Sequence, residues 1–278
     1  MSKRTWFNRL TSDPLTLFTL AFILFIFFVS ASATWIAPYS YEVQDPGRIL
    51  ASPSTDHWFG TDRLGRDLFS RVIYGSQISI SMALLTTVIA FLFGTTLGAT
   101  SGYVGGKLDN FLMRVVDVAY SFPDLLLIIL IGVLIGRGFL GILLALSLVS
   151  WVGVARLVRG EVLRYRETQF VESARSIGCS GGRILFFHIL PNILGPLIVT
   201  LTFRIPVVIL AESTLSFIGI GISPPLSSWG TLAHDGWTGM KFYPHLILFP
   251  IAVIFLTIFS FNRLGEVLRN AFDPEMRV

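Results

Sequence analysis

The 278-residue sequence contains little charge and almost no cysteine. Charged residues make up 14% of the chain and hydrophobic residues 53%, and the mean hydropathy is +0.72, far above the values of soluble proteins. The single cysteine, Cys179, excludes an internal disulfide and a cysteine-based metal cluster. The net charge of +4 is too modest to indicate nucleic acid as a partner. The composition therefore places the chain in a lipid bilayer.

The sequence also lacks the motifs of a catalytic site. It has no HExxH and no GxSxG motif, and no histidine falls within a helical turn of a second metal-ligand type in a spanning segment. An intramembrane hydrolase is therefore disfavoured, and we expect no catalytic residue, no metal and no cofactor. The histidines are His57, His188, His234 and His245.

The stretch 101–108 imitates a phosphate-binding loop but departs from it at two required positions. Ser101 stands where the first glycine of GxxxxGK[ST] belongs. Leu108 follows Lys107, where a serine or threonine must reach magnesium. The stretch is better interpreted as a tight turn, and we expect no ATP site in this chain.

Six apolar stretches are long enough to cross a membrane. The first follows a basic N-terminal segment and ends near Ala31-Ser32-Ala33, as a signal peptide would. Its apolar run of about 23 residues is too long for the central region of a signal peptide, so we predict an uncleaved first span. The sequence predicts an all-α membrane protein with six transmembrane helices, over about 15–37, 78–99, 111–136, 140–155, 193–218 and 246–261.

Basic residues are distributed unequally between the two sides of this topology. With a cytoplasmic N-terminus, the inner segments hold fourteen lysines and arginines and the outer segments six, in accordance with the positive-inside rule. Both termini and the loop of residues 165–191 are therefore predicted to be cytoplasmic. The inner residues are Lys3, Arg4, Arg9, Lys107, Arg114, Arg156, Arg159, Arg164, Arg166, Arg175, Arg183, Arg263, Arg269 and Arg277, and the outer ones are Arg48, Arg63, Arg66, Arg71, Arg137 and Lys241.

The 165–191 loop is a polar, arginine-bearing interruption between two hydrophobic stretches. Apolar residues at helical spacing between 168 and 177 predict a short helix, and Gly178 follows where a left-handed C-terminal cap would fall. Gly181 and Gly182 allow a sharp turn into a second short helix over Arg183 to Leu190. An ordinary amphipathic loop packed against its own bundle would show the same periodicity.

The residue types in this loop resemble the EAA loop of permease subunits from bacterial ABC importers. Glu172, Ala174, Gly178, Leu190 and Pro191 fall at its spacing, whereas Ser173 replaces the usual second alanine and His188 the usual isoleucine. In that family the loop forms a coupling helix that docks into a cleft on the ATP-hydrolysing subunit. The resemblance therefore implies that Glu172, Ser173, Ala174, Gly178, Leu190 and Pro191 couple this chain to an ATPase.

The 57–71 block, HWFGTDRLGRDLFSR, precedes the second span in the longest polar loop. Its pattern predicts an outer interfacial helix capped by Asp62, with Leu64, Leu68 and Val72 on one face and i,i+4 pairs Asp62–Arg66 and Asp67–Arg71. A plain interfacial helix without a substrate role is the alternative. The block resembles the sequence segment before the second span in dipeptide, oligopeptide and nickel permeases. The residues that carry the resemblance are Gly60, Thr61, Asp62, Gly65, Arg66, Asp67 and Arg71.

Several polar residues fall at membrane depth, where charge is costly and usually functional. Asp117, Tyr120 and Asp124 lie near one face of the third span, which Pro123 should bend, and we predict that this face lines a transport pathway. Alternatively, Asp117 lies near the membrane surface and pairs with Arg114. In the fifth span, Arg204 and Glu212 are on neighbouring helix faces, and each could pair across helices.

Two further patterns concern packing and the membrane interface. Gly94 and Gly98 give the second span a small-residue face for close helix contact. A second outer loop over 224–244 carries Trp229 and Trp237, which we predict to be interface anchors. We expect a first unit over residues 1–76 and a five-helix core over 77–278.

The resemblance implies an ATP-driven import permease in the bacterial cytoplasmic membrane. Its expected partners are a second, related permease subunit, two cytoplasmic ATP-binding subunits and an extracytoplasmic solute-binding protein. Peptides are the favoured cargo, with nickel or a metal chelate as the alternative. An ion-coupled secondary transporter using Asp117, Asp124, Arg204 and Glu212 is the competing class. A carrier of that kind has no need of a docking helix, so the loop favours the importer.

Overall fold

The computed structural model describes residues 13–272, which form a bundle of long helices. The basic residues Lys3, Arg4, Arg9 and Arg277 lie outside the described residues. The elements in chain order are α2 (Pro14–Ala31), α3 (Ala33–Ile36), η1 (Pro46–Arg48), α4 (Leu68–Val104), α5 (Gly106–Tyr120), α6 (Asp124–Ile135), α7 (Phe139–Arg166), α8 (Gln169–Ser176), α9 (Gly181–Ile184), η2 (Leu185–Ile189), α10 (Leu190–Phe217), α11 (Trp229–Trp237) and α12 (His245–Phe272).

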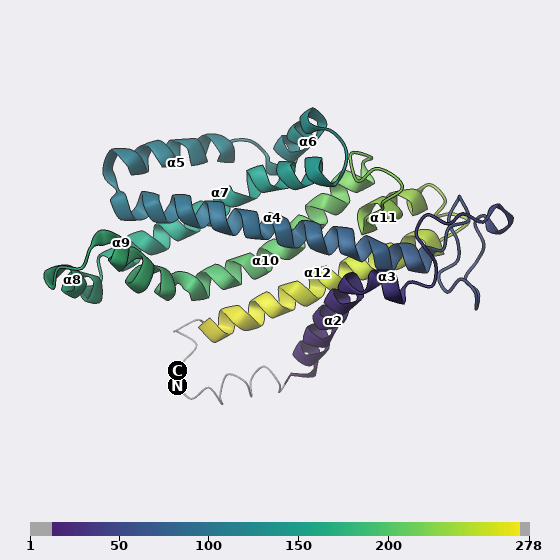
Figure 1. The fold of residues 1–278 in the computed structure, drawn as a ribbon, viewed down its shortest axis with the longest axis horizontal. Helices are drawn as coiled ribbons and strands as arrows, with labels where there is room; N and C mark the ends of the chain where they lie inside the picture. The colour runs from purple at the N-terminus through teal and green to yellow at the C-terminus, as the bar shows by residue number, and fades with distance from the viewer. Residues whose placement is uncertain (1–12, 273–278) are drawn as a thin grey trace.

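The long helices α4, α7, α10 and α12 run roughly side by side, with loops gathered at two opposite ends (Figure 1). The short helices α8 and α9 lie at one end. The irregular chain before α4 and the short helix α11 lie at the other. The predicted loops are therefore separated by the length of the bundle.

Five of these helices are long and apolar enough to cross a membrane, and a bent pair makes a sixth candidate span. The pair is α5 and α6, which meet at 86°. The predicted third span is therefore broken, because Pro123 lacks an amide donor and disfavours helical geometry in the residue before it. The second span begins at Leu68 and the last one ends at Phe272, so both are longer than the apolar stretches predicted.

A glycine seam joins α4 to α7. A Cβ at Gly94 would lie 2.7 Å from the Cβ of Val154, and one at Gly98 would lie 2.4 Å from the carbonyl oxygen of Ala155. Gly102 continues the series one turn further, against Arg159. The predicted small-residue face is confirmed, since only glycine lets the two backbones approach this closely.

The loop over 224–244 folds into the bundle instead of lying on its surface. Ser228 and Thr231 form a capping box at the start of α11. Trp229 is fully buried and its indole donates to the carbonyl oxygen of Val72 at 3.0 Å. The prediction of an interface anchor is therefore wrong for Trp229, whereas Trp237 is exposed.

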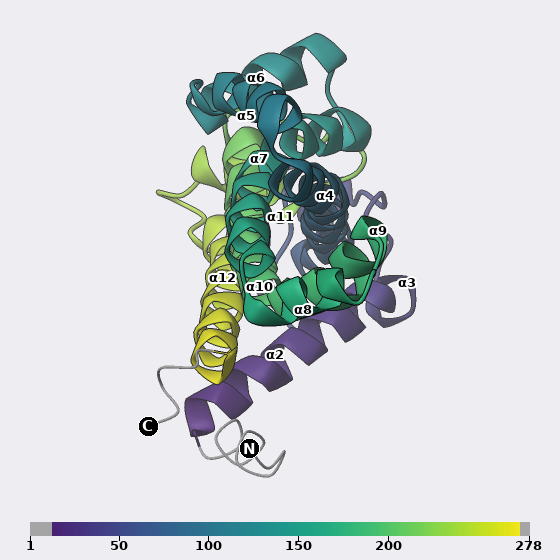
Figure 2. The ribbon, with the colours of Figure 1, turned by 90° about the vertical axis from the view of Figure 1, so that its left-hand side faces the viewer.

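Helix α2 crosses one side of the bundle at an angle and packs against α4 and α12 (Figure 2). Asp13 caps it and also accepts from Arg263 of α12 at 2.6 Å. The Arg263 guanidinium, with help from the Thr16 hydroxyl, lowers the pKa of the Asp13 carboxyl to about 2. This ion pair therefore stays charged throughout the physiological pH range.

Candidate functional site

The 165–191 loop forms a short helix, α8, as its periodicity predicts. Val171 and Ala174 bury one face of α8, while Glu172 and Ser173 are exposed on the other. Gly178 has φ +84°, and it closes the helix with a paired hydrogen-bond motif. The Cys179 amide donates to Ala174 and the Gly178 amide to Arg175. The predicted left-handed cap is confirmed.

The second half of the loop is continuous with the fifth span. After Gly181 the chain turns through α9 and the π-helical segment Leu185–Ile189, and runs without a break into α10. Helical structure over Arg183 to Leu190 is therefore confirmed, but the expected end of a short helix before Pro191 is wrong. Pro191 follows directly on the π-helical segment and is the second residue of α10, so it does not end the preceding helical segment.

The loop is attached to the ends of α4 and α7. Arg166 donates to the carbonyl oxygen of Tyr103 at 3.1 Å, and the Tyr103 ring lies against Gly181. Large apolar side chains of the loop remain exposed. Ile177 is 81% exposed and Phe187 75% exposed. The loop thus presents apolar side chains as well as the exposed Glu172 at this end of the bundle.

The 57–71 block does not form the predicted interfacial helix. Residues 57–67 are turns, and α4 begins at Leu68 with Asp67 as its N-cap. Asp62 is not a helix cap: its Oδ1 accepts from the amides of Leu64 and Arg66 inside a turn. Leu64 consequently does not share a helix face with Leu68 and Val72.

Two glycines enforce this irregular path. Gly60 has φ +79° and Gly65 φ +71°, the left-handed region that L side chains disfavour. A Cβ at Gly60 would lie 2.5 Å from the carbonyl oxygen of Ala51. One at Gly65 would lie 1.9 Å from that of Asp45. Thr61 is buried and its hydroxyl accepts from the Ala51 amide, so the block packs against residues 45–51 and is hydrogen-bonded to them.

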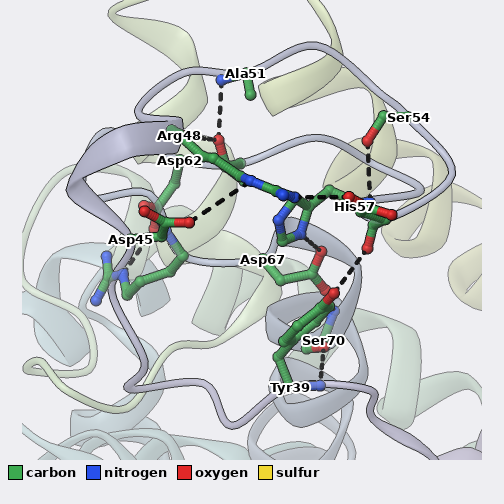
Figure 3. A network of polar contacts seen from close by, with 12 residues as sticks. Tyr39, Asp45, Arg48, Ala51, Ser54, His57, Asp62, Asp67 and Ser70 are labelled. Atoms are coloured by element: carbon green, nitrogen blue, oxygen red, sulfur yellow. Dashed lines mark hydrogen bonds and ion pairs between the residues drawn. The ribbon is translucent and has the colours of Figure 1, made fainter.

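A buried acidic residue organises each half of the block. Asp62 accepts from Arg66 at 2.7 Å, which confirms that predicted pair, but Arg71 also donates to Asp62 instead of pairing with Asp67. Asp67 accepts from His57 at 2.8 Å and caps α4 through the Ser70 amide at 2.7 Å. Figure 3 shows the half of this network around His57, Asp67 and Ser70, in which the Tyr39 amide donates to the Ser70 hydroxyl.

Asp117 and Tyr120 meet a cation that the sequence did not identify as their partner. Arg156 of α7 donates to Asp117 at 2.5 Å, and its guanidinium lies 3.9 Å from the centre of the Tyr120 ring. The predicted alternative, Arg114, does not pair with Asp117. Asp124 begins α6 beyond the bend, so it does not share one continuous helix face with Asp117 and Tyr120.

Arg204 and Glu212 lie in different surroundings: Arg204 packs against α7, whereas Glu212 is buried among serine hydroxyls. Arg204 lies against the backbone of α7, since a Cβ at Gly153 would lie 2.4 Å from its guanidinium. Glu212 is fully buried and accepts from Ser216 at 2.7 Å and Ser79 at 3.3 Å. The two residues do not pair with each other, in agreement with their spacing.

The structure also brings together residues that the sequence patterns missed. Asp109 of α5 accepts from Arg159 of α7 at 2.6 and 2.7 Å and from the Ser101 hydroxyl of α4. Asp235 of α11 lies 3.6 Å from Arg71. Both contacts join residues far apart in the sequence, so no local pattern could reveal them.

Comparisons with known proteins agree with this architecture. The family described as "Binding-protein-dependent transport system inner membrane component" matches residues 94–278. A second model, "N-terminal TM domain of oligopeptide transport permease C", matches residues 2–53. Among solved structures, an inward-facing MetNI methionine ABC transporter covers 72% of this chain and 97% of that chain with a TM-score of 0.54, at 17% identity. An amino acid ABC transporter matches with a TM-score of 0.56 over 73% of this chain and 93% of that chain.

Curated relatives match over almost the whole chain. The oligopeptide transport system permease protein OppC of Bacillus subtilis is 38% identical over 97% of this chain and 88% of that protein. The dipeptide transport system permease protein DppC of the same organism is 40% identical over 97% and 85%. The glutathione transport system permease protein GsiD of Pectobacterium atrosepticum is 36% identical over 99% and 91%.

The helical fold and these matches define a multi-pass membrane subunit of an ABC importer. The chain belongs to the binding-protein-dependent transport permeases of the bacterial inner membrane, within the group that includes the peptide permeases. Such a subunit works with an ATPase and a solute-binding protein and is a transport component.

Proposed function

We propose that this chain forms one half of the pore through which an ATP-driven importer moves di- or oligopeptides across the cytoplasmic membrane. The cargo is inferred from the relatives, whose names specify oligopeptides, dipeptides and glutathione. The second half is a related permease chain. Two cytoplasmic ATP-binding subunits and an extracytoplasmic binding protein complete the complex, and this chain contributes no ATP site.

The geometry of α8 is the observation that carries this proposal. The helix projects from the end of the bundle, packs against α7 and is joined by the Gly178 cap and the turn at Gly181 to α9, which runs on into the spanning helix α10. A displacement of α8 would thus reach α10 through this short connection. Glu172, Ser173 and the exposed residues beside Gly178 form the surface offered to an ATPase, while Ala174 anchors it and Leu190 and Pro191 begin the helix that responds.

The proposed orientation has this end of the bundle in the cytoplasm. The positive-inside distribution of the sequence supports it, since Arg164, Arg166, Arg175 and Arg183 all fall in or beside the loop. The opposite end, with the 57–71 block and α11, then faces outward, where a binding protein delivers cargo. Residues 1–76 form an N-terminal unit on the core of residues 77–278.

Four of the intramembrane polar residues, Asp117, Tyr120, Asp124 and Arg204, are proposed to face the translocation pathway. Asp117 and Tyr120 are more than half exposed on the single subunit although they lie in a span, as a pathway between two subunits requires. Glu212 is fully buried inside the subunit. We therefore assign it to bracing α11 rather than to contact with cargo. Uptake that is unchanged in Asp117→Asn and Asp124→Asn would contradict the pathway assignment.

Gly178→Val tests the coupling role. Valine cannot adopt φ +84° without strain, so the cap of α8 and the shape of its surface should change while the bundle remains intact. We expect normal insertion, loss of peptide uptake and release of the ATPase subunits on purification in mild detergent. Gly160→Ala, at an exposed glycine of α7 with no neighbouring atom within 4 Å, is the control. Normal uptake by Gly178→Val would count against the proposal.

A further inference from the structure

A small charged cavity lies at the proposed outer end, between the 57–71 block and α11. Its volume is about 240 Å³, and Asp62, Arg63, Arg66, Arg71 and Asp235 contribute its charged lining. Four leucines and Gly236 complete the wall. With three arginines against two aspartates, the lining carries one excess positive charge.

The carboxylate of Asp62 has no acceptor position left for a further arginine donor. Its Oδ1 accepts from two backbone amides, and its Oδ2 accepts from Arg66 and Arg71. A carboxylate offers about four acceptor positions, so all are taken. Asp235 is half-exposed and lies 3.6 Å from Arg71, too far for a hydrogen bond.

Two arginines retain unused donors. The Nε of Arg71 is buried and donates to no atom of residues 13–272. Arg63 is exposed, and within the same described part of the chain its guanidinium donates to the hydroxyl of Thr238 but to no carboxylate. A guanidinium prefers a carboxylate, which is an acceptor-only group that matches its geometry.

We infer that this cavity receives an acidic side chain of the extracytoplasmic binding protein. The inference rests on the proposed function, because it requires the outward orientation and that partner. The cavity is smaller than the roughly 300–1,000 Å³ of ordinary small-molecule sites, so it fits one side chain better than a peptide. It also lies within a single subunit, between α4, α11 and α12, rather than along the exposed face of α5.

Substitutions of Asp235 and Arg63 should change the affinity for the binding protein in opposite directions. In a carboxylate-binding cavity Asp235 repels the incoming group and competes for Arg71. Arg63 attracts it. Arg63→Gln should therefore weaken binding and Asp235→Asn should strengthen it, each by about three- to fivefold at low salt, and both differences should shrink at high salt. Were Asp235 only a brace for α11, its substitution would weaken binding.

The test uses the complete importer in lipid nanodiscs and its purified binding protein, with the dissociation constant measured at low and high salt. Arg137→Gln is the matched control, since it removes one exposed positive charge from the turn between α6 and α7 and does not line the cavity. We expect wild-type affinity for this variant. Arg63→Gln is preferred to a substitution of buried Arg71, which would disturb the fold.

Equal affinities for wild type, Arg63→Gln and Asp235→Asn would overturn the inference and leave the proposed function intact. A wild-type complex that never binds its binding protein would defeat the proposed function instead. Uptake of free and C-terminally amidated peptides distinguishes the cargo as the source of the carboxylate. If Arg63→Gln reduces uptake of the free acid alone, without changing the affinity for the binding protein, the inference is wrong.

Discussion

The α-carbon of Gly65 lies against the backbone carbonyl of Asp45, so closely that a Cβ would stand 1.9 Å from the carbonyl oxygen. Gly65 also has φ +71°. Both observations require glycine here: a side chain would collide with Asp45, and the positive φ angle disfavours any residue with a Cβ. The contact holds together two parts of the loop before α4 that are distant in the sequence, and it fixes the turn in which Asp62 accepts from Arg66 and Arg71.

Gly65→Ala should therefore destabilise the loop before α4. The left-handed conformation alone costs about 1–2 kcal/mol for alanine, and the backbone must also move away from Asp45. We expect a lower midpoint in thermal denaturation of the purified complex, with faster proteolysis in residues 38–67. Gly160→Ala should leave the midpoint unchanged or raise it, because alanine favours a helix interior. Equal midpoints for the two variants would contradict the close contact.

Asp67 allows a graded test of the start of α4. Asp67→Asn keeps an oxygen that accepts from the Ser70 amide, but it weakens the contact with His57, whereas Asp67→Ala loses both. Loss of an N-cap costs about 0.5–2 kcal/mol. We expect stability in the order Asp67, then Asn, then Ala, measured by thermal unfolding. Asn and Ala variants of equal stability would show that Asp67 does not cap the helix.

The spans and the cap of α8 could be predicted because their signals are local. Hydropathy marks the spans, and Gly178 follows a short amphipathic helix at the position where helices end. The prediction of a helix in the 57–71 block failed for a definite reason. Asp62 and Arg66 do pair, but in a turn, and the spacing of charges cannot distinguish that turn from a helix. The constraint that decides it, Gly65 against Asp45, is a tertiary contact.

The burial of Trp229 and the partner of Asp117 could not be predicted from the sequence either, because both depend on tertiary contacts. Trp229 looks like an interface anchor in a polar loop, yet α11 folds back so that its indole reaches Val72. Asp117 has Arg114 one turn away, yet it pairs with Arg156 because the chain reverses after α6. The bend at Pro123 was predictable in place but not in size, since its 86° depends on what α5 and α6 pack against.

The ion pair between Asp109 and Arg159 should stabilise the attachment of α5 to α7. It is bidentate and mostly shielded on the Asp109 side. Charge-assisted hydrogen bonds of this kind contribute about 1.5–3 kcal/mol. Asp109→Asn and Arg159→Gln should each lower the thermal midpoint, and the double variant should lose less than the sum of the two. Strict additivity would show that the two residues do not interact.

Glu212 is a fully buried acidic residue that links several helices through hydrogen bonds. Its carboxyl accepts from Ser216 of its own helix and from Ser79 of α4. Ser79 in turn accepts from the Trp229 amide, the first amide of α11. The network thus joins three helices around one side chain, and removing that side chain leaves the Ser79 and Ser216 hydroxyls without their acceptor.

Glu212→Ala should therefore cost about 3 kcal/mol or more, from the cavity together with the unpaired hydroxyls. Glu212→Gln should retain most of the stability, since its amide oxygen can accept from a serine and serine hydroxyls can reverse to accept from its NH₂ group. The measurement is thermal unfolding of the detergent-purified subunit. Thr86→Val is the control, because the Thr86 hydroxyl is buried without a partner in residues 13–272 and its loss should be neutral or stabilising. If Gln destabilises as much as Ala, an amide cannot replace the carboxyl group in this serine network, and the expected tolerance of Gln is wrong.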